Sequence, residues 1–228
     1  MARRPLRYAA VLAALVPLLA LAAPAEATTP SVYRLKDVAD AKQVIAVTNR
    51  SWTSSYATLQ AFEKQSNGTW RSVFGPWTAR IGRNGFGSPK REGDGQSPVG
   101  SYRIPGMFGV AANPGTQYRW LRVDRSDVWV DDPYSTYYNL HMRLPANGRW
   151  RSAEPMYQPT AYAYAAVIGY NTARRPWLGS AIFLHTSTGT STAGCVSLHA
   201  SQLVPLLRWL NWYKNPRVVM GPESVVAY

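Results

Sequence analysis

The chain has 228 residues, of which 46% are hydrophobic, 12% aromatic and only 16% charged, and this composition favours a folded core over wholesale disorder. It carries 25 Lys and Arg against 12 Asp and Glu, for a formal net charge of +13. Its single cysteine, Cys195, excludes a disulfide scaffold, an iron–sulfur cluster and a cysteine-based zinc ribbon. With only three histidines besides, we expect neither a metal site nor a cofactor.

Residues 1–27 are typical of a secretory signal segment. Three arginines precede an apolar run at 9–23, and the A-x-A pattern that ends at Ala27 predicts cleavage after that residue. The run is interrupted by Pro17 and is shorter than the roughly 18 apolar residues that span a bilayer. Cleavage removes three arginines and one glutamate, so residues 28–228 would form a secreted, single-domain protein of charge +11.

The positive charge predicts a particular kind of partner. It would draw the secreted protein to anionic cell-wall polymers, with a strength that falls as salt rises. Lys and Arg are scattered along the chain and no nucleic-acid motif is present, so we expect no nucleic-acid partner. No segment after the signal is long and apolar enough to predict a membrane span.

Short strands separated by turns are predicted along most of the mature chain. Strong β-formers recur at 43–48 and 56–63, and an Asn-Gly pair at 67–68 predicts a hairpin turn. Further strands are predicted at 69–74, 78–81, 100–104, 119–123, 127–130, 165–170 and 181–185. Leucines on one face predict a helix over 200–212, soon after the cysteine. Many short strands with one late helix predict a mainly β sandwich or barrel-like domain.

The lone cysteine is informative in a secreted protein. An unpaired thiol is a liability in an oxidising compartment, unless it is buried as a small apolar side chain or used as a nucleophile. The surroundings of Cys195 favour the second interpretation. Gly194, directly before it, allows backbone N–H groups to approach a reacting carbonyl. The helix predicted to start nearby would favour the thiolate, because a helix N-terminus carries partial positive charge.

His185 is the candidate base for this thiol. It ends a predicted strand ten residues before Cys195, and a loop rich in Thr, Ser and Gly joins the two. Cys–His catalysis needs a base within about 3 Å of the sulfur, held by a third polar group. A buried structural histidine is the alternative for His185 alone, but its pairing with a lone cysteine favours catalysis. His141 and His199 are predicted to be structural or to contact substrate, and the acidic pair at 131–132 to form a solvated turn.

Two stretches of sequence resemble the L,D-transpeptidases of the YkuD type. One is His185 followed by TAGC at 192–195, which is similar to the family's His and Ser/Thr-x-Gly-Cys signature. The other is KREGDGQSPVG at 90–100, which is similar to the family's K-x-E-G-D-G-x-T/S-P-x-G stretch. Further segments, similar to those of the secreted actinobacterial branch, are residues 129–133, 167–171 and 179–185. Together they cover about 43–220 and imply the family's β-sandwich.

The resemblance implies acyl transfer on peptidoglycan stem peptides. Cys195 would be the nucleophile and His185 the proton donor and acceptor, with the backbone N–H groups of Gly194 and Cys195 as an oxyanion hole. A backbone carbonyl, Ser191 or Thr192 would orient the histidine. The thiolate would attack the third residue of a stem, a diamino acid, and release the terminal D-Ala. An amine of a neighbouring stem would then resolve the thioester and form a 3→3 cross-link.

Several features leave alternatives open. Water as the acceptor would make the same site an L,D-carboxypeptidase. Most family members have Arg two residues after the cysteine, where this chain has Ser197, and the short interval between His185 and Cys195 predicts a more open mouth. A catalytically inactive protein, which binds the cell wall through its charge and its nine Trp and 14 Tyr, is the alternative from another class.

Overall fold

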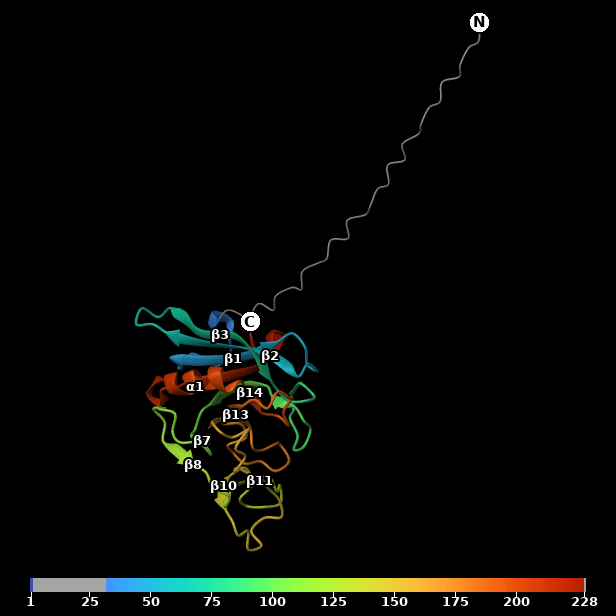
Figure 1. The fold of residues 1–228 in the computed structure, drawn as a ribbon, viewed down its shortest axis with the longest axis vertical. Coiled ribbons are helices and arrows are strands. Elements are labelled where there is room, and N and C mark those ends of the chain that lie inside the picture. Colours follow the sequence, from blue (N-terminus) through green and yellow to red (C-terminus); the bar gives the residue numbers. More distant parts are fainter. Residues whose placement is uncertain (2–31, 228) are drawn as a thin grey trace.

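The computed structural model describes Met1 and residues 32–227, so the predicted signal segment and its cleavage site lie outside the described residues. The described chain is mainly β, as predicted (Figure 1). Its strands are β1 (Gln43–Asn49), β2 (Tyr56–Lys64), β3 (Trp70–Arg80), β4 (Phe86–Gly87), β5 (Ser97–Pro98), β6 (Gly100–Arg103), β7 (Met107–Gly109), β8 (Trp120–Arg122), β9 (Asp127–Val130), β10 (His141–Arg143), β11 (Ala153–Pro155), β12 (Ala165–Val167), β13 (Phe183–Thr186), β14 (Val196–Leu198) and β15 (Arg217–Pro222). Its helices are α1 (Ala200–Trp209) and α2 (Glu223–Val226), with 3-10 turns η1 (Val32–Arg34) and η2 (Trp212–Lys214).

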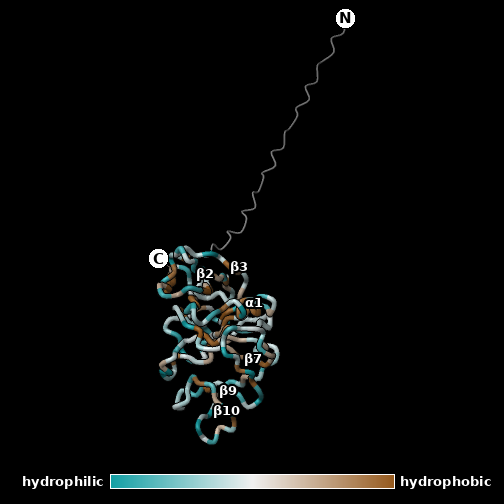
Figure 2. The backbone as a smooth tube through the Cα atoms, turned by 90° about the vertical axis from the view of Figure 1, so that its left-hand side faces the viewer, coloured by the Kyte–Doolittle hydropathy of each residue, from teal (hydrophilic) through white to brown (hydrophobic). Residues whose placement is uncertain are grey.

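Ten of the strands form one large sheet in the order β6-β15-β1-β2-β3-β14-β13-β12-β7-β8. Three neighbouring pairs within it, β1–β15, β13–β14 and β7–β8, are parallel, and the other pairs are antiparallel. A three-stranded sheet, β10-β9-β11, lies at the end of the described structure away from β1–β3 (Figures 1 and 2). Strands β13 and β14 lie inside the large sheet, so neighbouring strands hold this pair on both sides: β12 next to β13, and β3 next to β14.

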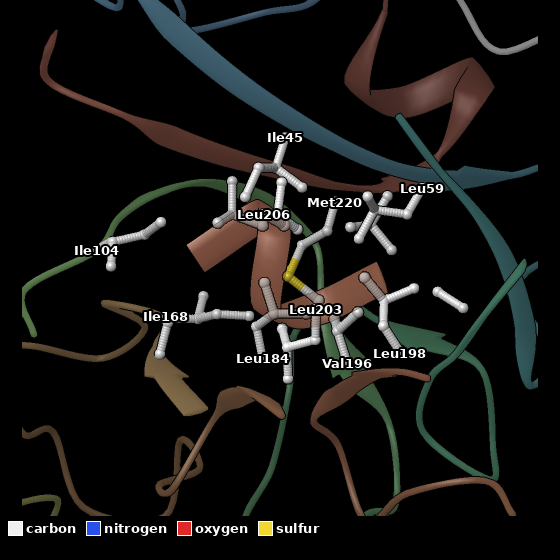
Figure 3. Close-up of a cluster of buried hydrophobic side chains, with 14 of the residues drawn as sticks. Ile45, Leu59, Ile104, Ile168, Leu184, Val196, Leu198, Leu203, Leu206 and Met220 are labelled. Atoms are coloured by element: carbon white, nitrogen blue, oxygen red, sulfur yellow. The ribbon is translucent and has the colours of Figure 1, made fainter. Parts of the chain in front are cut away.

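The core forms where the large sheet packs around α1. Figure 3 shows Leu203 and Leu206 of α1 between Ile45 and Met220 on one side and Leu184 on the other, and all five belong to one buried cluster. Hydrophobic segments gather around this helix in the middle of the molecule (Figure 2). Burial of a leucine or isoleucine side chain contributes roughly 1.5–3 kcal/mol, so this cluster anchors the sheet on which the candidate site stands.

Several strand predictions agree closely with the structure, and the strand predicted at 127–130 is β9. β1 and β2 match the predicted 43–48 and 56–63, and Gly68 has the positive φ of +83° that the predicted turn requires. The predicted strands 69–74 and 78–81 instead form one continuous strand, β3. The strand predicted from 181 begins only at Phe183, because Ala181 has a left-handed φ of 53° that breaks extended structure.

The predicted helix also begins as expected but is shorter than expected. It ends at Trp209, because Leu210 has an extended backbone. Asn211 then starts a separate turn, since its side chain accepts a hydrogen bond from the backbone N–H of Tyr213 at 2.9 Å and its own N–H donates to Gln43 Oε1 at 2.8 Å. The leucines that predicted the helix are its buried face, so the pattern was correct and only the C-terminal boundary was wrong.

Candidate active site

Two neighbouring parallel strands place the predicted catalytic pair. The register of β13 and β14 pairs His185 with Ser197, which puts Cys195, two residues earlier, opposite Phe183. Side chains two residues apart on a strand point to the same face. His185 and Cys195 therefore face the same side of the sheet, about one pleat repeat apart. Both line a single cavity of about 380 Å³.

The cavity carries several charged side chains beside the predicted pair. Three carboxyl groups, those of Glu92, Asp131 and Glu154, line it together with the ammonium group of Lys90. Lys90 is buried and pairs with Asp94 at 2.8 Å. Of this set Lys90, Glu92, Asp94 and Asp131 belong to stretches that the sequence had singled out, so only the position of Glu154 is new information from the fold.

Burial keeps the thiol of Cys195 protonated in the resting protein. The side chain is 7% exposed, its Sγ accepts a hydrogen bond from the N–H of Phe183 at 3.3 Å, and it donates to the carbonyl of Ala181 at 3.3 Å. Burial first, and then the negative charge of Glu154, raises the pKa of the thiol to about 12. The predicted help from a helix N-terminus is absent, because strand β14 separates Cys195 from α1. The thiolate is therefore not the resting form of Cys195.

His185 is buried beside this thiol in its neutral form. Burial lowers the pKa of the imidazole, although the backbone carbonyls of Thr186 and Ala161 oppose the shift. The Nδ1–H donates to the carbonyl of Thr186 at 2.8 Å, and since a carbonyl can only accept, Nε2 is the nitrogen left to take up a proton. The ring of Tyr162 packs edge-on against the imidazole, with centroids 5.3 Å apart. No hydrogen bond joins His185 to Cys195 in the described residues.

The group that orients the histidine is a backbone carbonyl, that of Thr186, and not the side chain of Thr192. The Thr192 hydroxyl donates to the carbonyl of Cys195 at 2.7 Å and accepts from the N–H of Gly194 at 3.1 Å. Thr192 thus shapes the loop that carries the cysteine. Ser191, the other predicted candidate, lines the cavity without a hydrogen bond to His185. The sequence could not decide between these groups because all of them lie within ten residues of one another.

Gly194 occupies a position that only glycine fits. Its φ is +154°, and a Cβ there would lie 2.8 Å from the carbonyl oxygen of Gln96 and 3.2 Å from Ile182 Cδ1. Its N–H, predicted to serve an oxyanion hole, donates to Thr192 in this structure. An oxyanion could receive that N–H only if the Thr192 hydroxyl released it. The tight packing gives a structural reason for glycine at this position.

The stretch at 90–100 packs directly beneath the cysteine loop. The hydroxyl of Ser97 donates to the carbonyl of Gly194 at 2.7 Å and accepts from the N–H of Gly82 at 3.0 Å. It lies 3.3 Å from the carbonyl oxygen of Cys195 as well. The two stretches that carry the family resemblance are therefore joined by a buried side chain.

The sequence analysis missed Glu154, whose carboxylate accepts a hydrogen bond from Tyr162 beside the cysteine. The Tyr162 hydroxyl donates to Glu154 Oε1, and Gln158 Nε2 donates to the same oxygen at 3.4 Å. Burial raises the pKa of Tyr162, and its side chain belongs with Cys195 to one buried cluster. Burial also raises the pKa of Glu154. No local sequence pattern predicted a role for Glu154, which lies on the short strand β11, or for Gln158 and Tyr162, which lie in the loop after it.

Asn139 supports the backbone that holds the sulfur. Its Oδ1 accepts from the N–H of Ala181 at 3.2 Å and from Trp129 Nε1 at 2.8 Å, while its Nδ2 donates to the carbonyls of Tyr170 and Asn171. Asn139 itself is buried with a φ of 58°, a conformation that asparagine tolerates better than most residues. It therefore fixes Ala181, whose carbonyl accepts the thiol hydrogen.

The remaining sequence candidates fall outside the pair or differ from expectation. His141 bonds to Asp127 at 2.8 Å in the three-stranded sheet, and His199 bonds to Ser201 at 2.8 Å at the start of α1. The acidic pair at 131–132 is not a solvated turn. Asp132 is buried, and its carboxylate accepts hydrogen bonds from the backbone N–H groups of Tyr134 and Arg151. Asp131 lines the cavity.

Within residues 32–227 no three or more His, Cys, Asp or Glu side chains are grouped so that they could hold a metal ion. None of the helices in the described part of the chain is long and apolar enough to cross a membrane. Comparisons with protein-family models, with curated proteins and with solved structures find no match for this chain.

Proposed function

We propose that this chain is a secreted, cysteine-dependent acyltransferase that acts on peptidoglycan stem peptides, with the β-sandwich and the L,D-transpeptidase activity that its sequence motifs imply. The observation that carries the proposal is that His185, on β13, and Cys195, directly before the adjacent parallel strand β14, line one cavity. A neutral, buried imidazole next to a protonated thiol is the resting state from which proton transfer can generate a nucleophile.

The reaction follows from the protonation states. When a stem peptide enters the cavity, Nε2 of His185 takes the thiol proton and Sγ of Cys195 bonds to the carbonyl carbon of the third residue. The C–N bond to the terminal D-Ala then breaks, and the imidazolium returns its proton to the departing amine. The resulting thioester retains enough free energy to acylate an amine without ATP. The acceptor amine attacks the same carbonyl, gives a proton to His185, and releases the thiol.

The charge of the cavity favours an amine as the acceptor. The carboxyl groups of Glu92 and Asp131 line it, and Asp131 Oδ1 is buried with no hydrogen-bond partner in the described residues. Negative charge attracts a cationic amine but has no such effect on water. This supports 3→3 cross-linking over L,D-carboxypeptidase activity, which needs the same two catalytic residues.

The test uses residues 28–228 with a purified disaccharide-tetrapeptide, and protein and products are followed by mass spectrometry. We expect loss of D-Ala, a thioester adduct on the protein, and a cross-linked dimer. Cys195→Ala should abolish the adduct, and His185→Ala should slow its formation at least about 100-fold. His199→Ala, an exposed histidine outside the cavity, is the matched control and should leave the rate unchanged.

Two results would overturn this proposal in different ways. Release of D-Ala without dimer would leave the acylation step intact and make the protein a carboxypeptidase. If neither adduct nor product forms with several stem types while the protein still co-sediments with cell walls, the catalytically inactive wall-binding alternative takes its place.

A further inference from the structure

A second cavity lies apart from the one that holds Cys195 and His185. It is a cleft of about 750 Å³ that shares no lining residue with the cavity around Cys195. Strand β6, one edge of the large sheet, lines it together with the segment that leads into β8, the opposite edge. The N–H of Gly169 donates to the carbonyl of Arg103 at 2.8 Å and bridges part of this seam. The cleft therefore lies where the two edges of the curled sheet approach each other.

The cleft is cationic. Arg103, Arg119 and Arg217 line it, and no acidic residue does. Arg103 and Arg217 both form ion pairs with the carboxylate of Asp40. The hydrogen bond from the Arg217 guanidinium is the main cause that lowers the pKa of this carboxyl group. Arg119 is exposed and has no acidic partner among the described residues. One carboxylate therefore offsets three guanidinium groups, which leaves a local excess of positive charge.

One of these arginines has a hydrogen-bond donor that nothing in the structure satisfies. The Nη2 group of Arg217 donates to Asp40 at 3.0 Å and 3.2 Å, but its Nε is buried and has no partner among the described residues. A buried N–H without a partner costs free energy, and an acceptor that entered the cleft would recover it. Guanidinium groups bind carboxylates and phosphates in a fixed, often bidentate geometry, so an anion is the kind of acceptor that suits this donor.

The cleft also presents an aromatic surface at its rim. Trp212 lines the cleft with 58% of its surface exposed, and its ring lies against that of Tyr213, with centroids 4.7 Å apart. The amide side chains of Gln117 and Asn215 and the hydroxyl of Thr172 lie on the same lining. An exposed indole offers an apolar face with a polar edge, and amides and hydroxyls both donate and accept hydrogen bonds. This combination matches a sugar ring, which has apolar C–H faces and a rim of hydroxyl groups.

We propose that this cleft binds an anionic glycan, with the acidic group of the glycan on Arg119 and Arg217 and a sugar ring against Trp212. The edge of β6 is less suited to an extended peptide, because the Gly169 N–H already occupies the carbonyl of Arg103. Such a site would hold the protein on a polymer while the separate cavity around Cys195 remains accessible. It makes no use of Cys195 or His185, so it does not depend on the proposed catalytic function.

The experiment measures binding by calorimetry at low and at moderate salt, with Cys195→Ala as the background so that no reaction interferes. The probes are glycan strands freed of their stem peptides, which carry lactyl carboxylates, and a poly(glycerol phosphate) polymer. A neutral oligosaccharide of N-acetylglucosamine and poly-glutamate serve as comparisons. The variants are Arg119→Gln and Trp212→Ala, both at exposed positions where folding should be unaffected.

We expect at least one charged glycan polymer to bind, and each variant to weaken its binding about tenfold. The matched controls are Arg71→Gln on strand β3 and Trp52→Ala, both exposed and outside the cleft, and both should change the affinity less than twofold. Whichever polymer binds more tightly identifies the acidic group as carboxylate or phosphate. Equal losses in Arg119→Gln and Arg71→Gln would show diffuse charge attraction and overturn the site. Binding of poly-glutamate that is insensitive to Trp212→Ala, or no binding of either polymer at low salt, would also overturn it.

Discussion

The hydroxyl of Ser97 donates a 2.7 Å hydrogen bond to the carbonyl of Gly194, a residue 97 positions later and adjacent to the only cysteine. Ser97 is fully buried, and it also accepts from the N–H of Gly82. One side chain thus satisfies two backbone groups from segments that are distant in the sequence. This explains in physical terms why a Ser-Pro stretch far upstream of Cys195 belongs to the same site.

Ser97→Ala should lower the free energy of unfolding by about 2 kcal/mol, because it leaves a buried N–H and a buried C=O without a partner. It should also slow acylation of Cys195 by a stem peptide, since the loop that holds the sulfur loses its anchor. Chemical denaturation measures the first effect. Ser101→Ala is the matched control, because its hydroxyl donates to the carbonyl of Asp37 in an exposed position. Equal effects of the two changes would contradict the anchoring role.

The reactivity of Cys195 towards iodoacetamide should rise about tenfold per pH unit well beyond pH 9, since burial raises the pKa of the thiol to about 12 and only the thiolate reacts. Glu154→Gln removes a negative charge near the sulfur, so it should lower the pKa of the thiol and speed alkylation at every pH above neutrality. Glu223→Gln, far from the cavity, controls for net charge and should change nothing. A titration midpoint below pH 8 in the wild type would refute this account.

The protonation of His185 should make the fold sensitive to acid. Its pKa is lowered in the folded protein, so the unfolded chain binds a proton first as pH falls below about 6.5. The stability that His185 contributes is thus complete above that pH and is lost as pH falls towards the folded pKa. The difference in unfolding free energy between wild type and His185→Gln should shrink by up to about 1.4 kcal/mol per pH unit in this range. A difference that does not change between pH 7 and pH 5 would contradict this account.

Ser197 stands where most members of the resembled family have arginine, and it gives a prediction of opposite sign to that for Ser97. Its hydroxyl is buried and has no hydrogen-bond partner among the described residues. Ser197→Ala removes a polar group that the fold does not satisfy, so the free energy of unfolding should stay constant or rise by up to about 1 kcal/mol. Thermal or chemical denaturation of Ser197→Ala beside Ser97→Ala provides the measurement. A loss of more than about 1 kcal/mol would indicate a partner that the structure lacks.

The parts of the molecule that the sequence predicted well are those governed by local chemistry. The strands at 43–48 and 56–63 follow from alternation, the turn between β2 and β3 from an Asn-Gly pair, and the start of α1 from its leucine face. The proximity of His185 and Cys195 also followed, because a strand end and a short loop restrict where the cysteine can lie. These features need only residues within about ten positions of one another.

The rest of the site depends on contacts between distant segments. Tyr162 and Asn139 come from loops, and Glu154 comes from the short strand β11 of the three-stranded sheet. Asn139 holds Ala181, and Glu154 accepts a hydrogen bond from Tyr162. Thr192 was predicted to orient the histidine because a hydroxyl near a histidine is a good partner, but the nearer carbonyl of Thr186 takes that role. Spacing along the chain cannot distinguish a side chain from a neighbouring backbone group.

The parallel pairing of β13 with β14 has a consequence for how this site can change. The register of the two strands, and not the loop that joins them, sets how far His185 stands from Cys195. The exposed residues at the tip of that loop, 188–190, can therefore lengthen or shorten without displacing the reacting groups, because closing a longer loop costs little free energy. A change in the length of this loop, which contributes Thr188 to the cavity lining, would therefore reshape the cavity around an unaltered pair.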